Sequence, residues 1–262
     1  MKFEVLGCSG SDLPGFNPTS FRVDDVILLD AGTVTSVLTL EEQARITDIF
    51  VTHPHLDHIK DILFLADNLI ELVAHNHHKP VRIRGLKDVL QAIKNHLLND
   101  TIWPDFTVLP AYETPVLMYS PISDKEPVTL GDLRVATHPV NHGRCASGYV
   151  FWNETTGANF AYTGDTGPIT SGWWDFLNAL EIPIENLIIE ASFPDSQEHL
   201  ALLSHHLTPT LLKRELEKLD CVPNIFITHM KSPFATEITE QLHHALKGYS
   251  HHLLREGEVL HF

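Results

Sequence analysis

Five short apolar segments of this chain lead into a histidine or an aspartate. The residues at these positions are Asp30, His53, His142, Asp165 and His229. The segments are rich in β-branched and aromatic residues, which predicts strands. Side chains at strand ends gather on one rim of a sheet stack, where functional sites commonly form. A fold for this chain therefore has to bring five separated strand ends to one rim.

The second of these segments runs directly into a cluster of polar side chains. Residues 50–62 read FVTHPHLDHIKDI and hold His53, His55, Asp57 and His58. Histidine and aspartate are good ligands for zinc and similar divalent ions. Four ligands crowd one ion but divide naturally between two, as His53 with His55 and Asp57 with His58. Since the pattern arises by chance in roughly one such histidine-rich sequence in two hundred, ligands elsewhere decide its meaning.

The later strand ends supply such ligands. HPVNHG (138–143) offers His142, with His138 as a less favoured choice. Asp165 lies in a glycine-flanked turn, where its two carboxylate oxygens can bridge two cations, and His229 directly follows an apolar strand. A lone strand-end histidine is more often structural, but the set together favours a metal site.

The remaining histidine clusters lack this context. They are the HNHH stretch at 75–78 and the pairs at 243–244 and 251–252. They fall on predicted helix or loop segments rather than at strand ends. We expect them to be solvated surface.

Composition restricts the partners. The chain has 262 residues and is 43% hydrophobic, which is enough for the core of one domain over residues 1–262. Lys+Arg is 18 and Asp+Glu is 34, so the net charge is 18 − 34 = −16 with histidine neutral. Because an acidic surface repels phosphate backbones, we expect a small-molecule substrate and no long nucleic acid.

Cysteine usage and hydropathy predict a cytoplasmic protein. The three cysteines are far apart and form no CxxC pair, which argues against disulfides and a cysteine zinc site. The start, MKFEVLGCSGS, has no apolar signal-peptide core. No apolar run approaches the 18 residues that a membrane span needs.

Strands throughout the chain with helices between them predict two sheets flanked by helices. We expect strands at 2–6, 20–23, 26–30, 48–53, 81–85, 133–140, 147–153, 159–165, 187–193 and 224–230. We expect helices at 36–46, 58–72, 86–98 and 210–219, the last capped by Thr208 with Pro209 at its first position. The segment 100–130 is interrupted by prolines and gives no clear pattern.

The ligand order resembles that of the metallo-β-lactamase superfamily, over nearly the whole chain. The matching motifs are H-x-H-x-D-H at 53–58, the later His142, T-G-D-T-G around Asp165 and I-T-H-M around His229. The resemblance implies an α/β fold of the four-layer αββα sandwich type with a dinuclear metal site. It implies one ion on His53, His55 and His142, and another on Asp57, His58 and His229. Asp165 would bridge the ions, and Asp30 would orient a ligand.

Finer features resemble the class II 3′,5′-cyclic-nucleotide phosphodiesterases. H-x-H-L-D-H-I, LIIEASFP (187–194), SHHLTP (204–209) and ITHMK match segments of that family. The sequence departs at Asp61, where the family usually has glycine, and at Ser204 and His205 before His206. The resemblance implies hydrolysis of cyclic AMP or cyclic GMP to the 5′-monophosphate.

The implied mechanism uses two divalent ions, zinc being favoured over manganese or iron. A hydroxide held between the ions would attack phosphorus. His206, oriented by Glu190, would protonate the leaving oxygen, so these two residues join Asp57 in the predicted catalytic set. The alternative for His206 is a surface histidine at a helix start.

Other functions share these ligands. A tRNA 3′-processing endonuclease should carry a basic arm, which the sequence lacks, and the net charge disfavours it. A lactamase, thiolesterase or phosphonate-ester hydrolase stays open, as does a non-enzymatic metal-binding protein. A diiron redox protein would need a carboxylate at His55 and a flavin domain. The sequence leaves the choice of cyclic nucleotide and a homodimer open.

Overall fold

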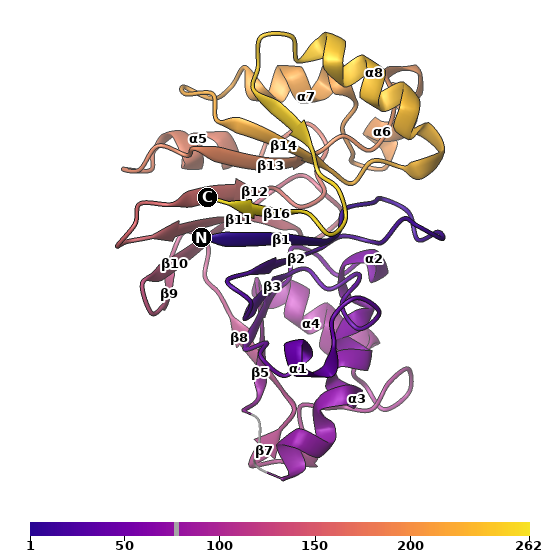
Figure 1. Cartoon of the computed structure of the whole chain (residues 1–262), viewed down its shortest axis with the longest axis vertical. Coiled ribbons are helices and arrows are strands. Elements are labelled where there is room, and N and C mark those ends of the chain that lie inside the picture. The colour runs from indigo at the N-terminus through magenta and orange to yellow at the C-terminus, as the bar shows by residue number, and fades with distance from the viewer. Residues whose placement is uncertain (76–78) are drawn as a thin grey trace.

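Two β-sheets pack face to face, and helices cover their outer faces, in the computed structural model of residues 1–75 and 79–262 (Figure 1). The first sheet has the strand order β16-β1-β2-β3-β4-β5-β8, and the second has the order β15-β14-β13-β12-β11-β10-β9. Helices α3 and α4 lie beyond the first sheet, and α7 and α8 lie beyond the second. The architecture is the predicted αββα sandwich.

The bounds of the elements are as follows. The first sheet contains β1 (Lys2–Gly7), β2 (Ser20–Val23), β3 (Ile27–Leu29), β4 (Asp48–Phe50), β5 (Val81–Gly85), β8 (Leu117–Pro121) and β16 (Val259–His261). The second contains β9 (Val128–Leu130), β10 (Leu133–Pro139), β11 (Ser147–Asn153), β12 (Asn159–Tyr162), β13 (Asn186–Glu190), β14 (Asn224–Thr228) and β15 (His251–Leu253). The helices are α1 (Leu40–Gln43), α2 (Leu56–Ile59), α3 (Asp61–Ala74), α4 (Lys87–His96), α5 (Trp173–Asn178), α6 (Glu198–Leu203), α7 (Pro209–Leu216) and α8 (Ala235–Ala245). A short ribbon pairs β6 (Pro110–Ala111) with β7 (Thr114–Pro115), and 3₁₀ turns occur at Asp195–Gln197 and Ser232–Phe234.

Alternation of side chains along the strands produces the layers. Phe50 points into the core between the sheets, whereas Ile49 and Val51 pack under the helices of the first sheet. In β13, Ile188 faces the core between the sheets and Ile189 faces the helices of the second sheet. Because successive strand residues point to opposite faces, strands that are apolar on both faces fill three layers of core at once.

The core between the sheets is rich in aromatic side chains. Phe3 contacts Phe21 and Phe160, and Phe50 contacts Tyr149 and Phe151. The ring centroids of these four pairs lie 5.0 to 5.5 Å apart. Such rings bury large apolar areas and join the two sheets. This packing fixes the relative position of the strand ends that carry the predicted ligands.

Both sheets change from antiparallel to parallel pairing. In the first, β3, β4, β5 and β8 are parallel, and in the second, β12, β13, β14 and β15 are parallel. The carboxyl ends of the parallel strands carry Asp30, His53, Asp165 and His229. The expectation that strand ends share one rim follows from this topology.

The two ends of the chain lie side by side, as Figure 1 shows. Strand β16 pairs with β1, and the backbone amide of Phe262 donates to the carbonyl oxygen of Met1 over 2.9 Å. The sequence did not predict β15 or β16, because both are short and only partly buried.

Two predicted helices differ from the structure. The helix expected at 36–46 is reduced to α1, because Thr39 forms a capping box with Glu42 and the helix starts four residues later, at Leu40. The helix expected at 58–72 is divided into α2 and α3, which meet at Lys60. The capping of α7 by Thr208 and Pro209 is confirmed. Among the described residues, no helix is long and apolar enough to cross a membrane.

The close approach of β11 to α5 gives a test of the sandwich. A Cβ atom at Gly148 would lie 2.6 Å from the Trp173 ring and 2.8 Å from the Tyr162 carbonyl oxygen, and Trp173 is fully buried. We expect Gly148→Ala to lower the free energy of unfolding by about 1–3 kcal/mol, measured by urea denaturation. Gly85→Ala is the control with a smaller expected loss, because its nearest atom lies at 3.2 Å. Equal stability of Gly148→Ala and the wild type would contradict this packing.

Candidate metal centre

The motif at 53–58 forms a loop and one helical turn after β4. His53 is buried, and its Nδ1 lies 3.0 Å from the Thr52 hydroxyl. His55 caps the amino end of α2, and that helix then places Asp57 and His58 one turn on. His53 and His55 therefore lie before α2, and Asp57 and His58 lie within it.

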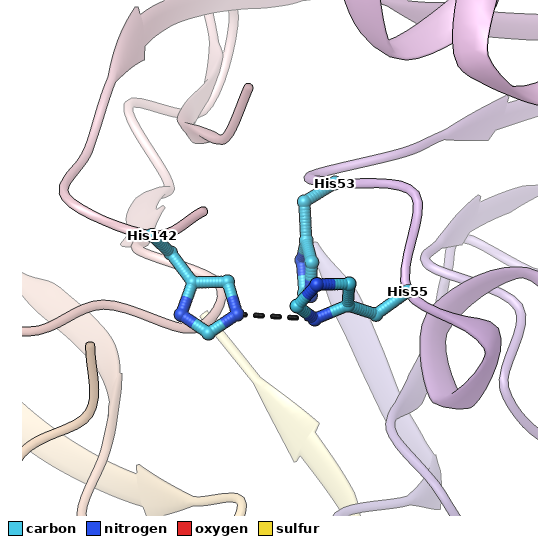
Figure 2. A group of neighbouring side chains, drawn as sticks. All are labelled: His53, His55 and His142. Atoms are coloured by element: carbon cyan, nitrogen blue, oxygen red, sulfur yellow. Dashed lines mark hydrogen bonds between the residues drawn. The ribbon is translucent and has the colours of Figure 1, made fainter. Parts of the chain in front are cut away.

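The first group of side chains is His53, His55 and His142, which Figure 2 shows converging from two loops. Nε2 of His142 lies 3.1 Å from Nδ1 of His55. Nδ1 of His142 donates to the carbonyl oxygen of His205 over 2.8 Å. Because a neutral imidazole carries one proton, this bond leaves Nε2 of His142 with a lone pair directed at the group.

The second group is Asp57, His58, Asp165 and His229. Nε2 of His58 and Nε2 of His229 each lie 3.3 Å from Oδ2 of Asp165. Oδ2 of Asp57 lies 3.4 Å from the same His229 nitrogen. The four side chains come from α2, the turn after β12 and the end of β14.

Asp165 stands between the two groups. Its Oδ2 also lies 3.7 Å from His53 and 3.9 Å from His142, so it faces imidazoles of both. Asp165 Oδ1 and His53 Nε2 are buried and have no hydrogen-bond partner among the described residues. Buried polar atoms without partners are costly. Cations between these donors would remove that cost, so the residues present fit a two-ion site.

The protonation states of the first group and of both carboxylates suit cations. Burial lowers the pKa of His53, His55 and His142, so these rings are held neutral. Burial alone would raise the pKa of Asp57 and Asp165, but neighbouring histidines, His229 foremost, hold both pKa values below the usual range. Neutral imidazoles and ionised carboxylates are the forms that bind divalent ions. Burial lowers the pKa of His58, but the Asp165 and Asp30 carboxylates outweigh burial and raise it above the usual value.

Asp30 supports this centre from beneath. It is fully buried, and its Oδ2 accepts from Nδ1 of His58 over 2.8 Å and from the Tyr162 hydroxyl over 3.0 Å. Its Oδ1 accepts from the backbone amide of Thr52 over 2.8 Å. Asp30 therefore orients the His58 ring and fixes the start of the 53–58 loop.

Strained backbone accompanies the centre. Asp30 and His229 have φ values of 56° and 59°, in the left-handed region that is uncommon for residues other than glycine. Such conformations cost free energy and persist where surrounding contacts determine them. Next to Asp30, a Cβ atom at Gly32 would lie 1.9 Å from the carbonyl oxygen of Asp57, so only glycine allows this approach.

Glu190 and His206 form a buried pair beside the ligand groups. Oε1 of Glu190 lies 2.7 Å from Nδ1 of His206 and accepts from the backbone amide of Thr166 over 2.8 Å. The His206 ring stacks on that of His229 with centroids 5.5 Å apart. His206 is buried, so the alternative of a solvated surface histidine is wrong.

The charge of each member of this pair depends on the other. Burial lowers the pKa of His206, but the Glu190 carboxylate outweighs burial and raises it above the usual value. Burial likewise raises the pKa of Glu190, and His206 more than offsets it, so the net pKa is lowered. The pair is therefore held as imidazolium and carboxylate.

Ser192 connects this pair to the centre, and it is not among the site residues predicted from the sequence. Its hydroxyl donates to Oε2 of Glu190 and lies 3.2 Å from Nδ1 of His206 and 3.0 Å from Nδ1 of His229. The sequence feature that could have pointed to Ser192 is the E-x-S pattern, in which the serine follows a strand-end glutamate by two residues. A serine has many structural uses, so that signal is weak.

The less favoured candidate His138 and the remaining histidine clusters lie apart from the centre. His138 pairs with Asp124 over 2.7 Å and contacts the carbonyl oxygen of Ser171, so its role is structural. His243 and His244 are exposed, and His252 pairs with Glu258 over 2.7 Å. Residues 76–78 of the HNHH stretch lie outside the described residues.

A family model described as cAMP phosphodiesterases class-II matches residues 32–245. The chain belongs to this family. The 3′,5′-cyclic-nucleotide phosphodiesterase 1 of Saccharomyces cerevisiae is 25% identical over 221 residues, which are 74% of this chain and 58% of that protein. The match therefore spans less than two thirds of that relative.

Solved structures place the fold. Unliganded yeast PDE1 superposes with a TM-score of 0.84 at 21% identity, covering 100% of this chain and 99% of that one. The metallo-β-lactamase fold protein YhfI from Bacillus subtilis has a TM-score of 0.74 at 16% identity, covering 99% of this chain and 98% of that one. The chain has the metallo-β-lactamase fold.

The departures from the family's pattern have structural explanations. The Asp61 carboxylate accepts from the backbone amides of Val34 over 2.6 Å and Thr35 over 2.8 Å, so it holds the loop after Asp30. His205 uses its carbonyl oxygen, rather than its ring, to orient His142. Neither departure removes a donor from the centre.

The support by Asp30 can be tested separately from activity. We expect Asp30→Asn to weaken divalent-metal binding by about 10–100-fold, because the His58 ring loses its charged partner. Competition with a chromophoric chelator measures the affinity. Asp124→Asn is the matched control, since it removes the partner of His138 outside the centre. Unchanged affinity in Asp30→Asn would contradict the proposed support.

Proposed function

We propose that the chain is a metal-dependent phosphodiesterase that hydrolyses a 3′,5′-cyclic nucleotide to the 5′-monophosphate. Membership of the class II family and the similarity to the 3′,5′-cyclic-nucleotide phosphodiesterase 1 of yeast support this substrate. The observation that carries the proposal is the Glu190–His206 pair, with its 2.7 Å contact, beside two groups of metal donors. The metal donors provide a site for the negatively charged phosphoryl group, and the Glu190–His206 pair provides an acid beside it.

The proposed ligand sets follow the geometry. His53, His55 and His142 would hold one divalent ion, and Asp57, His58 and His229 would hold a second, with Asp165 between them. When bound, two such ions would neutralise charge on the phosphoryl oxygens. They would also lower the pKa of a bound water molecule to about 7. Three imidazoles are a usual zinc set, so zinc is favoured, with manganese or iron as the alternatives.

His206 is the proposed general acid. Its Nδ1 is engaged by Glu190, which leaves Nε2 to carry the proton toward the reacting centre. Cleavage of the bond from phosphorus to the 3′ oxygen leaves an alkoxide, and the imidazolium proton would pass to that oxygen. Glu190 holds the ring and stabilises its charge, and Ser192 holds the carboxylate.

The surroundings agree with a small substrate. The net charge of −16 disfavours a long nucleic acid.

The three cysteines are free, which supports a reducing compartment such as the cytoplasm. A homodimer stays a prediction, which the oligomeric state in solution tests.

The ligand assignment predicts a joint loss of metal and activity. We expect His55→Ala and Asp57→Ala each to abolish hydrolysis of cyclic AMP and to lower the metal bound per chain, because each removes a donor from a different ion. Elemental analysis after dialysis gives the metal content. His243→Ala, an exposed histidine outside both groups, is the control and should change neither quantity. Wild-type turnover in either ligand variant would show that the assignment is wrong.

The role of His206 predicts a dependence on the leaving group. We expect His206→Ala to slow cyclic AMP hydrolysis by about 10²–10⁴-fold, because the alkoxide leaves without a proton. Bis(p-nitrophenyl) phosphate should be slowed far less, because p-nitrophenolate is a good leaving group. Rates on both substrates at saturating metal measure the difference.

The matched control for this prediction is His138→Ala, which removes a buried histidine with a carboxylate partner outside the centre. It should slow neither substrate selectively. Equal slowing of both substrates by His206→Ala would remove His206 from the role of acid.

A further inference from the structure

A cavity of about 560 Å³ adjoins the candidate metal centre on the side of His142. Three segments that are far apart in the sequence form it: the start of α4, the turn after β8 and the loop between β10 and β11. His142 belongs both to the cavity wall and to the first ligand group. A substrate whose phosphorus lies at the centre can therefore extend directly into this cavity.

Buried apolar side chains form part of the cavity wall. Ile122, Val140 and Ala146 are buried apolar side chains that line it. The charged side chains of the lining are Lys87, Asp88 and Arg144, all of them exposed. Small-molecule sites are typically concave and apolar with a few polar groups that fix orientation.

Arg144 is the polar group placed next to the centre. It lies two residues after His142, and between them Gly143 turns the chain with a φ of 56°. A Cβ atom at Gly143 would lie 4.0 Å from Nε2 of His55, so this loop runs against the first ligand group. Arg144 is thereby held within reach of a substrate bound at that group.

Arg144 also lacks a partner. Within the described chain, its guanidinium forms no hydrogen bond or ion pair, although acidic residues outnumber basic ones 34 to 18. Lys87, at the start of α4, also lines the cavity and likewise has no partner among the described residues. Cationic donors facing an apolar cavity call for a ligand that is rich in hydrogen-bond acceptors.

We propose that this cavity binds the nucleobase of the cyclic nucleotide and that Arg144 donates to N7 of a purine. Both adenine and guanine present N7 as an acceptor, and pyrimidines have no such atom. Asp88, which lines the same cavity, would accept from an exocyclic amino group. Arg144 is then a specificity-determining residue that favours cyclic purine nucleotides over cyclic pyrimidine nucleotides. This inference rests on the proposed phosphodiesterase function.

The test removes the two partners of the proposed contact separately: the Arg144 side chain and the N7 atom of the base. The metal-loaded wild type and Arg144→Ala are each assayed on cyclic AMP and on 7-deaza cyclic AMP, in which carbon replaces N7. We expect the wild type to favour cyclic AMP by about tenfold in kcat/KM, because a hydrogen bond to a charged donor is lost with N7. We expect Arg144→Ala to treat the two substrates alike, with the loss appearing mainly in KM.

Arg214→Ala is the matched control, because it removes an exposed arginine on α7, outside the residues that line the cavity. It should keep the wild-type preference for cyclic AMP. Equal use of both nucleotides by the wild type would overturn the N7 contact. An equal loss on both substrates in Arg144→Ala would also overturn it, because Arg144 would then contact the phosphate instead. If the loaded wild type hydrolyses neither nucleotide, the proposed function fails as well, which separates that failure from the others.

Discussion

The Asp165 carboxylate, buried among four imidazoles, is the interaction on which the rest of the structure depends. Its Oδ2 lies 3.3 to 3.9 Å from His53, His58, His142 and His229, while its Oδ1 has no partner among the described residues. A lone buried charge of this kind is expensive, and so are imidazole nitrogens that point at one another. Divalent cations resolve both costs. The arrangement of these donors is therefore explained by divalent ions, without reference to a substrate.

The surrounding structure holds these donors in place. Asp30 binds the His58 ring, a peptide carbonyl binds the His142 ring and Ser192 binds the His229 ring. Each contact leaves the other ring nitrogen turned toward the centre. Gly32 allows the Asp30 loop to lie against the backbone of Asp57. A hydrogen bond to the outer ring nitrogen sets the orientation and the tautomer of a histidine ring. These two properties decide whether the histidine can act as a ligand.

The sequence predicted most of the fold and of the candidate centre because both follow local rules. Apolar strands such as 48–53 and 224–230 stop at polar residues, and parallel pairing brings those ends together. The capping of α7 by Thr208 and Pro209 is equally local. By contrast, the pairing of β16 with β1 joins the two ends of the chain, and no pattern of neighbouring residues encodes it. Ser192 was missed for the same reason, since its role depends on Glu190, His206 and His229 meeting in space.

The central claim is that Asp165 joins two divalent ions held by separate histidine groups. Anomalous diffraction from crystals grown with zinc, recorded at the zinc absorption edge, tests it most directly. The account predicts two peaks, one among His53, His55 and His142 and the other among Asp57, His58 and His229, with an Asp165 oxygen within bonding distance of each. A single peak, or two peaks with the Asp165 carboxylate turned away from them, would contradict it.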